Sequence, residues 1–443
     1  MDKYTNKLGT PSGFRDLLPN DAARREYMIE KITNVYKSFG FLPLETPIAE
    51  FEDIILPESA SDFNLFRLES TNKRQGEGEK EEVALRFDLT IPLARVVSQY
   101  GNDLPRPFKR YQSGYVFRGE RPQKGRYRQF MQFDADIVGT KSLVADTEMI
   151  IMINEVLEAL EVKDFVIRVN TRTLLNTLPS FTSFADNLLR EVLIILDKAE
   201  KISSEELVEE LRRLRLQEST IKKISEFGQI FGKPREVISK LTDFFAGYED
   251  AQKGIGELET LANNLESFSL GDKVTFDMKI IRGLGYYTGI VFETNLLQAL
   301  EFGSVISGGR YDNLVERFTS QTIPAVGMSV GVDRLDTALA TLGVLKTKSK
   351  SRKIVVISQG APFDSYALSV ASRLRSEGII VDVYVGTKQD FKDIFSYAEQ
   401  VGASFTVIVG EDEMKSQTIN IRNLATREQK TVTFSAVSDV DFS

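Results

Sequence analysis

The stretch between Phe108 and Asp136 constrains the fold of this 443-residue chain more strongly than any other part of the sequence. Both of its ends alternate as strands do, and the run Arg121-Pro-Gln-Lys-Gly125 between them is typical of an exposed turn, so the pattern predicts a hairpin. Seven basic residues crowd into it: Lys109, Arg110, Arg118, Arg121, Lys124, Arg126 and Arg128. We therefore expect the hairpin to suit phosphate groups, while Asp134 and Asp136 offer anions to an ammonium or an imidazole group.

The composition is that of a globular protein long enough for two or three domains, with 42% hydrophobic and 27% charged residues. No apolar run reaches the roughly 18 residues that a membrane span needs, and the N-terminus lacks an apolar signal core, so we expect a cytoplasmic protein with no membrane partner. The net charge of −8 argues against indiscriminate binding of nucleic acids but allows a local basic stripe.

Two residue types are missing altogether, cysteine and histidine. Without cysteine there are no disulfides and no thiolate metal sites, and without histidine the commonest zinc ligand and the usual general base are lacking. We therefore expect no metal site built from protein side chains.

The N-terminal part begins with an amphipathic helix over residues 22–39, for which Asn20 and Asp21 are candidate caps and Gly40 is the expected stop. Residues 41–47 have the composition of a strand but contain prolines, which predicts an edge strand or an interface. Taken alone, this pattern fits an ordinary helix and edge strand as well as it fits an interface.

Three further regions follow. Residues 171–269 are helical with mixed charge and predict an inserted helical domain, whose charged runs form either a solvated face or a binding surface. Residues 344–353 are polar and basic, as in a linker. From 354 to 443, strands at 354–357, 379–385 and 405–409 alternate with helices near 365–377 and 391–401 that end at Gly378 and Gly402, which predicts a small, mostly parallel α/β sheet.

The hairpin sequence, with Phe117-Arg-Gly-Glu-Arg-Pro-Gln-Lys-Gly-Arg-Tyr-Arg-Gln-Phe130, resembles motif 2 of the class II aminoacyl-tRNA synthetases, and specifically that of the histidyl type. The helix and strand ending at Pro47 resemble motif 1, which implies a homodimer interface. Residues 354–443, including Gly410-Glu-Asp-Glu-Met414, resemble the anticodon-binding domain of the same enzymes. The resemblance implies an α/β protein whose antiparallel-sheet catalytic core spans residues 1–170 and 270–343, with residues 171–269 as the helical insertion.

Asp88 and Thr90 stand two residues apart and would share one face of an extended stretch, where an anion beside a hydroxyl suits an ammonium group. The resemblance implies that Asp88, Thr90 and Gln132 bind the ammonium group of the amino acid. A second interpretation is that Asp88 caps the proline-containing helix that follows.

The run Ile281-Arg-Gly-Leu-Gly-Tyr-Tyr-Thr-Gly289 resembles a histidine-specific motif of the family, with Gly285 in place of the family's Asp. Ser307-Gly-Gly-Arg-Tyr-Asp-Asn-Leu314 resembles a second such motif, in which paired glycines permit close backbone approach. Tyrosine hydroxyls both donate and accept hydrogen bonds, which suits a neutral imidazole. The resemblance implies that Tyr287 and Asp136 bind the imidazole nitrogens, with Tyr311 nearby.

Residues 325–334 resemble motif 3, a glycine-punctuated strand followed by a helix that starts near Arg334, although such a pattern is also common packing. The resemblance implies ATP carrying Mg²⁺ as the cosubstrate. It places the catalytic residues Arg118 and Arg282 at the α-phosphate, Arg126 and Arg334 at the other ATP phosphates, Glu120 at the adenine or ribose, and Phe130 against the adenine ring. No side chain has to act as a nucleophile or a general base, because orientation and fixed cations suffice.

The implied function is ATP-dependent attachment of histidine to its tRNA through histidyl-adenylate. The alternative is a catalytically inactive paralogue that senses histidine or tRNA, such as the regulatory subunit of ATP phosphoribosyltransferase or the tRNA-sensing domain of a stress kinase. Arg118, Arg282 and Arg334 favour the enzyme, whereas Gly285 favours the sensor.

Overall fold

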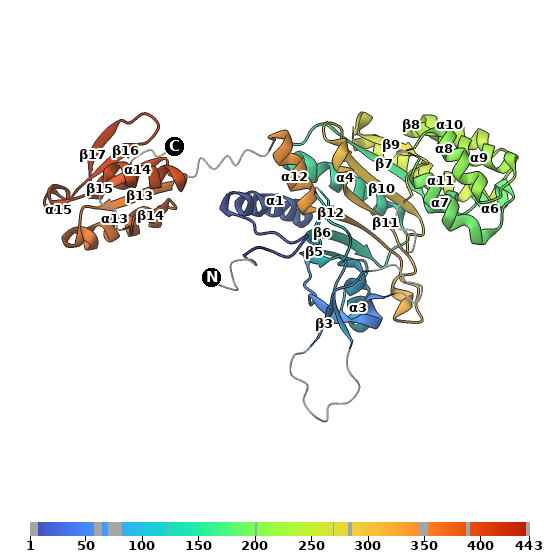
Figure 1. The fold of residues 1–443 in the computed structure, drawn as a ribbon, viewed down its shortest axis with the longest axis horizontal. Coiled ribbons are helices and arrows are strands. Elements are labelled where there is room, and N and C mark those ends of the chain that lie inside the picture. Colours follow the sequence, from blue (N-terminus) through green and yellow to red (C-terminus); the bar gives the residue numbers. More distant parts are fainter. Residues whose placement is uncertain are drawn as a thin grey trace, which may run out of the picture. The chain divides into compact units, whose positions relative to one another are not determined.

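The computed structural model describes residues 8–56, 64–69, 82–123, 125–199, 202–268, 270–281, 286–344, 353–386 and 390–439. The chain divides into two compact units, Met1–Leu345 and Lys346–Ser443 (Figure 1). Most of the expected linker, including residues 345–352, lies outside the described residues. None of the helices in the described ranges combines the length and the hydrophobicity that a bilayer crossing requires.

The first unit is built on a nine-stranded sheet in the order β1-β5-β6-β12-β11-β10-β7-β9-β8. All pairs from β5 to β7 in this order are antiparallel, so the expected antiparallel-sheet core is confirmed. The strands that form the centre are β5 (Phe108–Phe117), β6 (Gln129–Val138), β12 (Ala325–Gly331), β11 (Ser304–Arg310), β10 (Ile290–Leu296) and β7 (Phe165–Thr171). The remaining strands are β1 (Leu42–Pro43), β9 (Val274–Asp277) and β8 (Phe231–Gly232).

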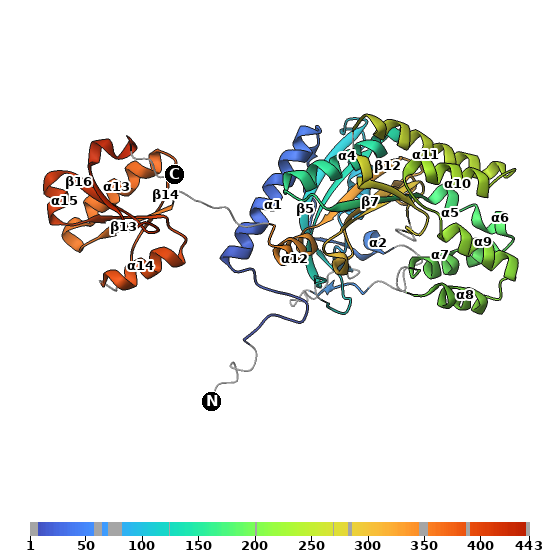
Figure 2. The ribbon, with the colours of Figure 1, turned by 90° about the horizontal axis from the view of Figure 1, so that it is seen from above.

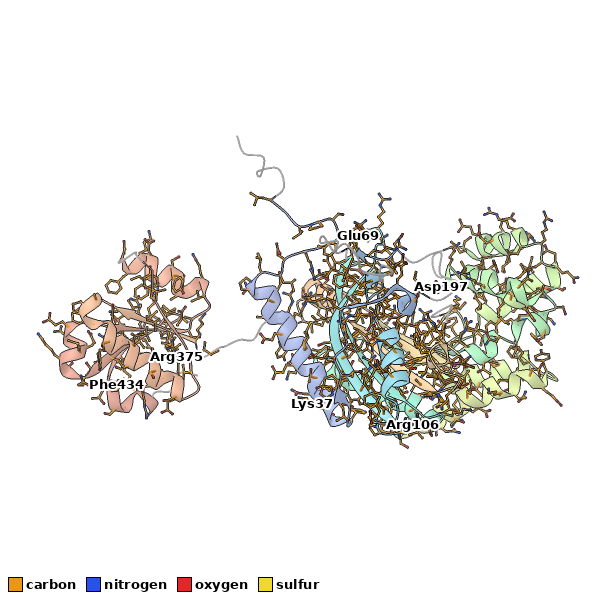
Figure 3. All side chains as sticks on the ribbon, turned by 90° about the horizontal axis from the view of Figure 1, so that it is seen from below. Lys37, Glu69, Arg106, Asp197, Arg375 and Phe434 are labelled. Atoms are coloured by element: carbon orange, nitrogen blue, oxygen red, sulfur yellow. The ribbon has the colours of Figure 1, made fainter. Side chains whose placement is uncertain are left out.

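Three helices, α1 (Pro19–Ser38), α4 (Leu143–Ala159) and α12 (Val332–Leu342), cover one face of the sheet (Figures 1 and 2). Their apolar side chains fill the space above the strands, and Met28, Met149 and Leu335 are fully buried there. Figure 3 draws the side chains on the ribbon and labels Lys37, the basic residue in the last turn of α1. Burial of this apolar surface is the main stabilising contribution to the unit.

The N-terminal predictions are confirmed in outline and corrected in detail. Helix α1 begins at Pro19, with Leu18 as an extended N-cap, so Asn20 and Asp21 lie inside the helix and do not cap it. Proline is tolerated in the first helical turn because its missing N–H has no partner there in any case. Gly40 does end the helix, with a φ of +80°. The following strand is only Leu42–Pro43, and as predicted it lies at an edge of the sheet, where it pairs in parallel with β5.

A small antiparallel sheet, β2 (Ala49–Phe51), β4 (Val83–Leu85) and β3 (Arg67–Leu68), lies beside helix α3 (Thr90–Tyr100) and the short helix α2 (Glu52–Ile55). Between β7 and β9 the chain forms a cluster of helices (Figure 1). These are α5 (Arg172–Leu175), α6 (Leu178–Thr182), α7 (Leu189–Asp197), α8 (Ser204–Arg213), α9 (Glu218–Gly228), α10 (Pro234–Phe244) and α11 (Gln252–Leu265). In α8, Leu207 and Leu211 are buried while the charged residues stay largely at the surface.

The second unit has its own apolar core and a five-stranded sheet in the order β14-β13-β15-β16-β17. The three predicted strands, β14 (Ile380–Val383), β13 (Lys353–Ser358) and β15 (Phe405–Val409), pair in parallel. Two antiparallel strands that the sequence analysis did not expect, β16 (Thr418–Asn423) and β17 (Gln429–Thr433), extend it, so the sheet is mixed rather than mostly parallel. Helices α13 (Asp364–Ser376) and α14 (Phe391–Gln400) lie near the predicted positions, and a short helix α15 (Glu411–Ser416) follows β15.

Candidate active site

The predicted basic hairpin exists, with β5 and β6 paired in antiparallel register from Phe108↔Val138 to Phe117↔Gln129. Not all of its cations face outward, however. Arg110 is fully buried and Lys109 pairs with Glu148 at 2.7 Å, so neither is available for phosphates as the sequence analysis expected. Among the described residues of the hairpin, Arg126 is an exposed cation near the turn.

The turn end of the hairpin brings an arginine and an aromatic ring together. The Arg118 guanidinium carbon lies 5.1 Å from the centre of the Phe130 ring, and its Nε donates to the Phe87 carbonyl oxygen at 3.2 Å. Glu120 and Arg126 are exposed beside them. A cation fixed over a ring forms a platform that suits a nucleotide, because the base can stack and the phosphates can meet positive charge.

At the other end of β6 the side chains form a buried polar cluster, in which each member is at most 3% exposed: Arg110, Asp134, Asp136 and Tyr311. The Tyr311 hydroxyl donates to Asp136 Oδ1, and Arg110 Nη2 lies 2.6 Å from Asp136 Oδ2 in an ion pair. Gly327 faces Asp136 across the β6–β12 pair, and a Cβ there would lie 1.9 Å from Asp136 Oδ1. Glycine is therefore required at this position for the carboxylate to occupy its place.

Burial dominates the electrostatics of this cluster. It raises the pKa of Asp134 to about 7, and although the Arg110 charge opposes the change, the Asp136 charge adds to it. Burial also raises the pKa of Asp136, against the effects of Arg110 and of the Tyr311 hydrogen bond. The pKa of Tyr311 lies well above its usual range because of burial and the Asp136 charge, so the hydroxyl keeps its proton and remains a donor.

Asp88 adopts the capping arrangement that was the second interpretation of the sequence. Its Oδ1 accepts the Ile91 N–H at 3.0 Å at the start of α3, and the helical backbone of Leu89 (φ −108°, ψ −5°) means that residues 88–90 are not extended. Asp88 is only 5% exposed, and burial raises the pKa of its carboxyl group. The positive charge of Arg118 is one of the influences that oppose this rise. Capping and ligand binding therefore need not exclude one another, because a carboxylate has further lone pairs.

The other predicted site residues that the structure describes come from several elements around this cluster. Gln132 follows on β6, and its Nε2 donates to the Ser329 hydroxyl of β12 at 2.7 Å. The Tyr287 ring lies 4.6 Å from the ring of Tyr286, which in turn lies 6.1 Å from that of Tyr311. Arg334 is in the first turn of α12, where its Nη1 donates to the Ser304 carbonyl oxygen at 2.7 Å. Arg282, Gly285 and Lys124 lie outside the described residues.

Comparison with known proteins identifies the family. A sequence model described as Histidyl-tRNA synthetase matches residues 13–335, which is more than half of the chain. The chain belongs to the histidyl-tRNA synthetase family. A second model, described as Anticodon binding domain, matches residues 353–440.

Individual members of the histidyl-tRNA synthetase family are similar over nearly the whole chain. A protein of Helicobacter pylori (strain HPAG1) named "Histidine--tRNA ligase" is 41% identical and covers 93% of each chain. One of the same name from Clostridium tetani is 38% identical and covers 98% of this chain and 97% of its own. The crystal structure of histidyl-tRNA synthetase from Nostoc sp. PCC 7120 has a TM-score of 0.85 and 34% identity, over 98% of both chains.

The sensor alternative has a structural counterpart of its own. A solved structure titled an ATP phosphoribosyltransferase regulatory subunit/histidyl-tRNA synthetase, from Bacillus halodurans, has a TM-score of 0.76 at 22% identity, covering 91% of this chain. At that identity the likeness shows the fold alone. The curated relatives named as ligases do not favour the sensor.

Two charged groups at the centre of the site, Arg110 and Asp134, differ from what the sequence predicted. Arg110 was expected to face phosphates and Asp134 to offer an anion to a ligand, whereas both are buried in the cluster around Asp136. A signal for Arg110 exists, because Phe108, Arg110 and Gln112 alternate along β5 and all three face inward. The inward partners of Arg110 come from β6, directly opposite in register. Asp134 could not be found in the same way. Strand β6 is buried without interruption from Gln132 to Val138, so buried and exposed residues do not alternate along it.

Proposed function

We propose that this chain is a histidine--tRNA ligase that joins histidine to its tRNA in two steps. In the first, the histidine carboxylate oxygen attacks the α-phosphorus of ATP, and pyrophosphate leaves. In the second, a terminal ribose hydroxyl of the tRNA attacks the carbonyl carbon of histidyl-adenylate, and AMP leaves. The proposal rests on one observation about strand β6. This strand carries both Phe130, which lies against Arg118, and Asp136, which accepts from Tyr311, so it links the platform to the buried pair.

Selection of histidine rests, in this proposal, on matching one donor and one acceptor. A neutral imidazole has one N–H and one unprotonated nitrogen. Tyr311 already donates to Asp136, so its oxygen and the carboxylate can accept the imidazole N–H, while the Tyr287 hydroxyl can donate to the other nitrogen. The buried Arg110 supports ionisation of Asp136. Asp88, Thr90 and Gln132 would receive the ammonium group.

The ATP end uses fixed cations, because negative charge grows on the phosphate oxygens as the α-phosphorus is attacked. Arg118 and Arg282 would act at the α-phosphate, and Arg126 and Arg334 at the remaining phosphates. Phe130 would stack on adenine and Glu120 would contact the adenine or ribose. Magnesium would enter with the ATP phosphates and neutralise part of their charge.

The second unit would bind the anticodon region of the tRNA, in keeping with the family that it matches. A homodimer formed through α1 and β1, and action in the cytoplasm, where translation takes place, complete the proposal. The inactive sensor would bind histidine without consuming ATP.

The test is histidine-dependent exchange of pyrophosphate into ATP, measured with each of the twenty amino acids. We expect exchange with histidine alone, and subsequent transfer to tRNA. A folded protein that binds histidine and performs no exchange would overturn the ligase in favour of the sensor.

A further inference from the structure

Residues 12–15, which precede α1, lie against the second strand of the hairpin. The Arg128 N–H donates to the Gly13 carbonyl oxygen at 2.8 Å, and the Arg128 side chain donates to the carbonyls of Ser12 at 3.4 Å and Glu120 at 3.1 Å. Gly13 has a φ of +84°, and a Cβ there would lie 2.7 Å from the Arg128 side chain. We call residues 12–15 the strap.

Arg15 connects the strap to two other elements. Its guanidinium carbon lies 4.1 Å from the centre of the ring of Tyr127, the residue that precedes Arg128 in the sequence. Its Nη2 donates to Asp333 Oδ1 at 2.6 Å. A planar guanidinium can stack on a ring and bind a carboxylate at the same time, which an ammonium cannot do equally well.

Asp333, in the first turn of α12, is the shared anchor. It is 3% exposed, and its Oδ2 accepts the Met131 N–H at 2.6 Å. Strand β12 ends at Gly331, which lies opposite Gln132 of β6. The Asp333 carboxylate therefore accepts a hydrogen bond from the β6 backbone just beyond the point where β12 ends. Its Oδ1 also accepts from Arg25 of α1.

The first strand of the hairpin is held from a different part of the chain. The Gly119 N–H donates to the Asn64 carbonyl oxygen at 2.8 Å, and the rings of Phe66 and Phe14 meet edge to face at 5.8 Å. The Arg118 N–H donates to the Arg128 carbonyl oxygen at 2.8 Å and joins the two strands. Both sides of the turn are therefore held by segments remote from it in sequence.

We propose that Arg15 and Asp333 are positioning residues for ATP, which fix the backbone of residues 127–131 and thereby the places of Arg126 and Phe130. The inference rests on the proposed function, because it needs Arg126 and Phe130 to contact ATP. Neither positioning residue has to touch the nucleotide. In the proposed function the imidazole of histidine meets Asp136, further along β6, so the effect should fall mainly on ATP.

The test compares Arg15→Ala with a matched control, Arg24→Ala, in the full chain. Arg24, in α1, also forms an ion pair with α12, with its Nε 2.5 Å from Asp336 Oδ1, but its partners Asp21 and Asp336 are not part of the hairpin. We expect Arg15→Ala to raise the KM for ATP in pyrophosphate exchange by roughly 10-fold or more, as displacement of a site by about 1 Å can do. The KM for histidine should stay within about twofold, and Arg24→Ala should change neither KM.

Two further variants separate positioning from general stability. Tyr127→Ala should also raise the KM for ATP, and the double variant should be no worse than Arg15→Ala, because loss of Arg15 already removes the contact with Tyr127. Arg15→Lys should restore part of the ATP affinity, since it keeps the charge opposite Asp333. Asp333→Asn is a third route to the same loss, but the Arg15 and Tyr127 variants decide the matter if that protein does not fold.

Direct binding of a non-hydrolysable ATP analogue, measured by calorimetry, keeps this inference separate from the proposed function. If the wild type binds the analogue but performs no exchange, the ligase is refuted, while a weaker affinity in Arg15→Ala alone still supports positioning. Equal affinities in the wild type and Arg15→Ala, equal losses in Arg15→Ala and Arg24→Ala, or no binding by the wild type would each overturn the inference.

Discussion

The hydroxyl of Tyr311 donates a hydrogen bond to Oδ1 of Asp136, between side chains that are 3% and 2% exposed. The two residues are remote in sequence and meet because β6, β12 and β11 are neighbours in the sheet. The pair thus reports both on the integrity of the core and on the proposed histidine pocket.

Replacing Tyr311 by Phe should remove one partner from a buried carboxylate while keeping the ring. We expect the free energy of unfolding to fall by about 1–3 kcal/mol and the KM for histidine to rise. Urea denaturation and exchange kinetics measure the two effects. Tyr36→Phe is the control, because its hydroxyl makes only a long bond of 3.3 Å to the Phe133 carbonyl oxygen. A histidine KM that is the same in both variants would remove Tyr311 from the pocket.

Substituting Gly327 by Ala should displace the Asp136 carboxylate, since the added Cβ would lie 1.9 Å from its Oδ1. We expect a loss of stability of about 1–3 kcal/mol, as for other overpacked cores, together with weaker binding of histidine by calorimetry. Gly331→Ala, at the end of the same strand, is the control, because its nearest contact would be an ordinary 3.6 Å. Unchanged histidine affinity in Gly327→Ala would contradict the assignment of Asp136.

Stability should decline as the pH rises between about 4 and 7 through the titration of Asp134. Its pKa is raised from 3.8 to about 7 on folding, so the folded state holds the proton more tightly in this window, and its contribution is lost as the pH rises through the folded value. The slope from one such group is at most about 1.4 kcal/mol per pH unit. The free energy of unfolding should be measured from pH 4 to 8 for the wild type and for Asp134→Asn, whose side chain is always neutral. The difference between the two proteins should be smallest at low pH, where Asp134 is protonated, and should change as the pH rises. Parallel curves would show that Asp134 is ionised throughout.

Removing residues 346–443 should leave histidine-dependent exchange largely intact, because the first unit contains the described site residues and has its own core. Transfer of histidine to tRNA should fall, since the unit that matches the anticodon-binding family is lost. Filter-binding measurements with labelled histidine follow the transfer step. A truncated protein that is folded but inactive in exchange would show that the two units depend on each other for the first step.

Much of this architecture was predictable because it depends on local patterns. The alternation around Arg121–Gly125 predicted the β5–β6 hairpin, and Gly378 and Gly402 marked helix ends in the second unit, where both have a positive φ. The prediction was wrong where long-range pairing decides the outcome. Arg110 belongs by composition to a basic surface, yet its position opposite Asp136 in the strand register places it in the core.

The candidate site was predictable only as far as its motifs extend. Asp136, Tyr311 and Gln132 were named from the sequence. The structure places Asp136 and Gln132 on β6 and Tyr311 directly after β11, two strands away in the sheet. The role of Asp333 could not be read from its own surroundings, because its partners Arg15, Arg25 and Met131 come from three distant segments. The assignments of individual residues to histidine and ATP remain predictions.

The order of strands in the large sheet has a consequence for synthesis of the chain. Strand β6 is made early, but its neighbour β12, with Gly327 opposite Asp136, is separated from it in sequence by the entire helical cluster. A chain emerging from the ribosome therefore carries the hairpin before β12 is present to pair with β6. If Asp136 and Tyr311 bind histidine as proposed, that ligand can stabilise the chain only after β12 has been translated and the first unit is nearly complete.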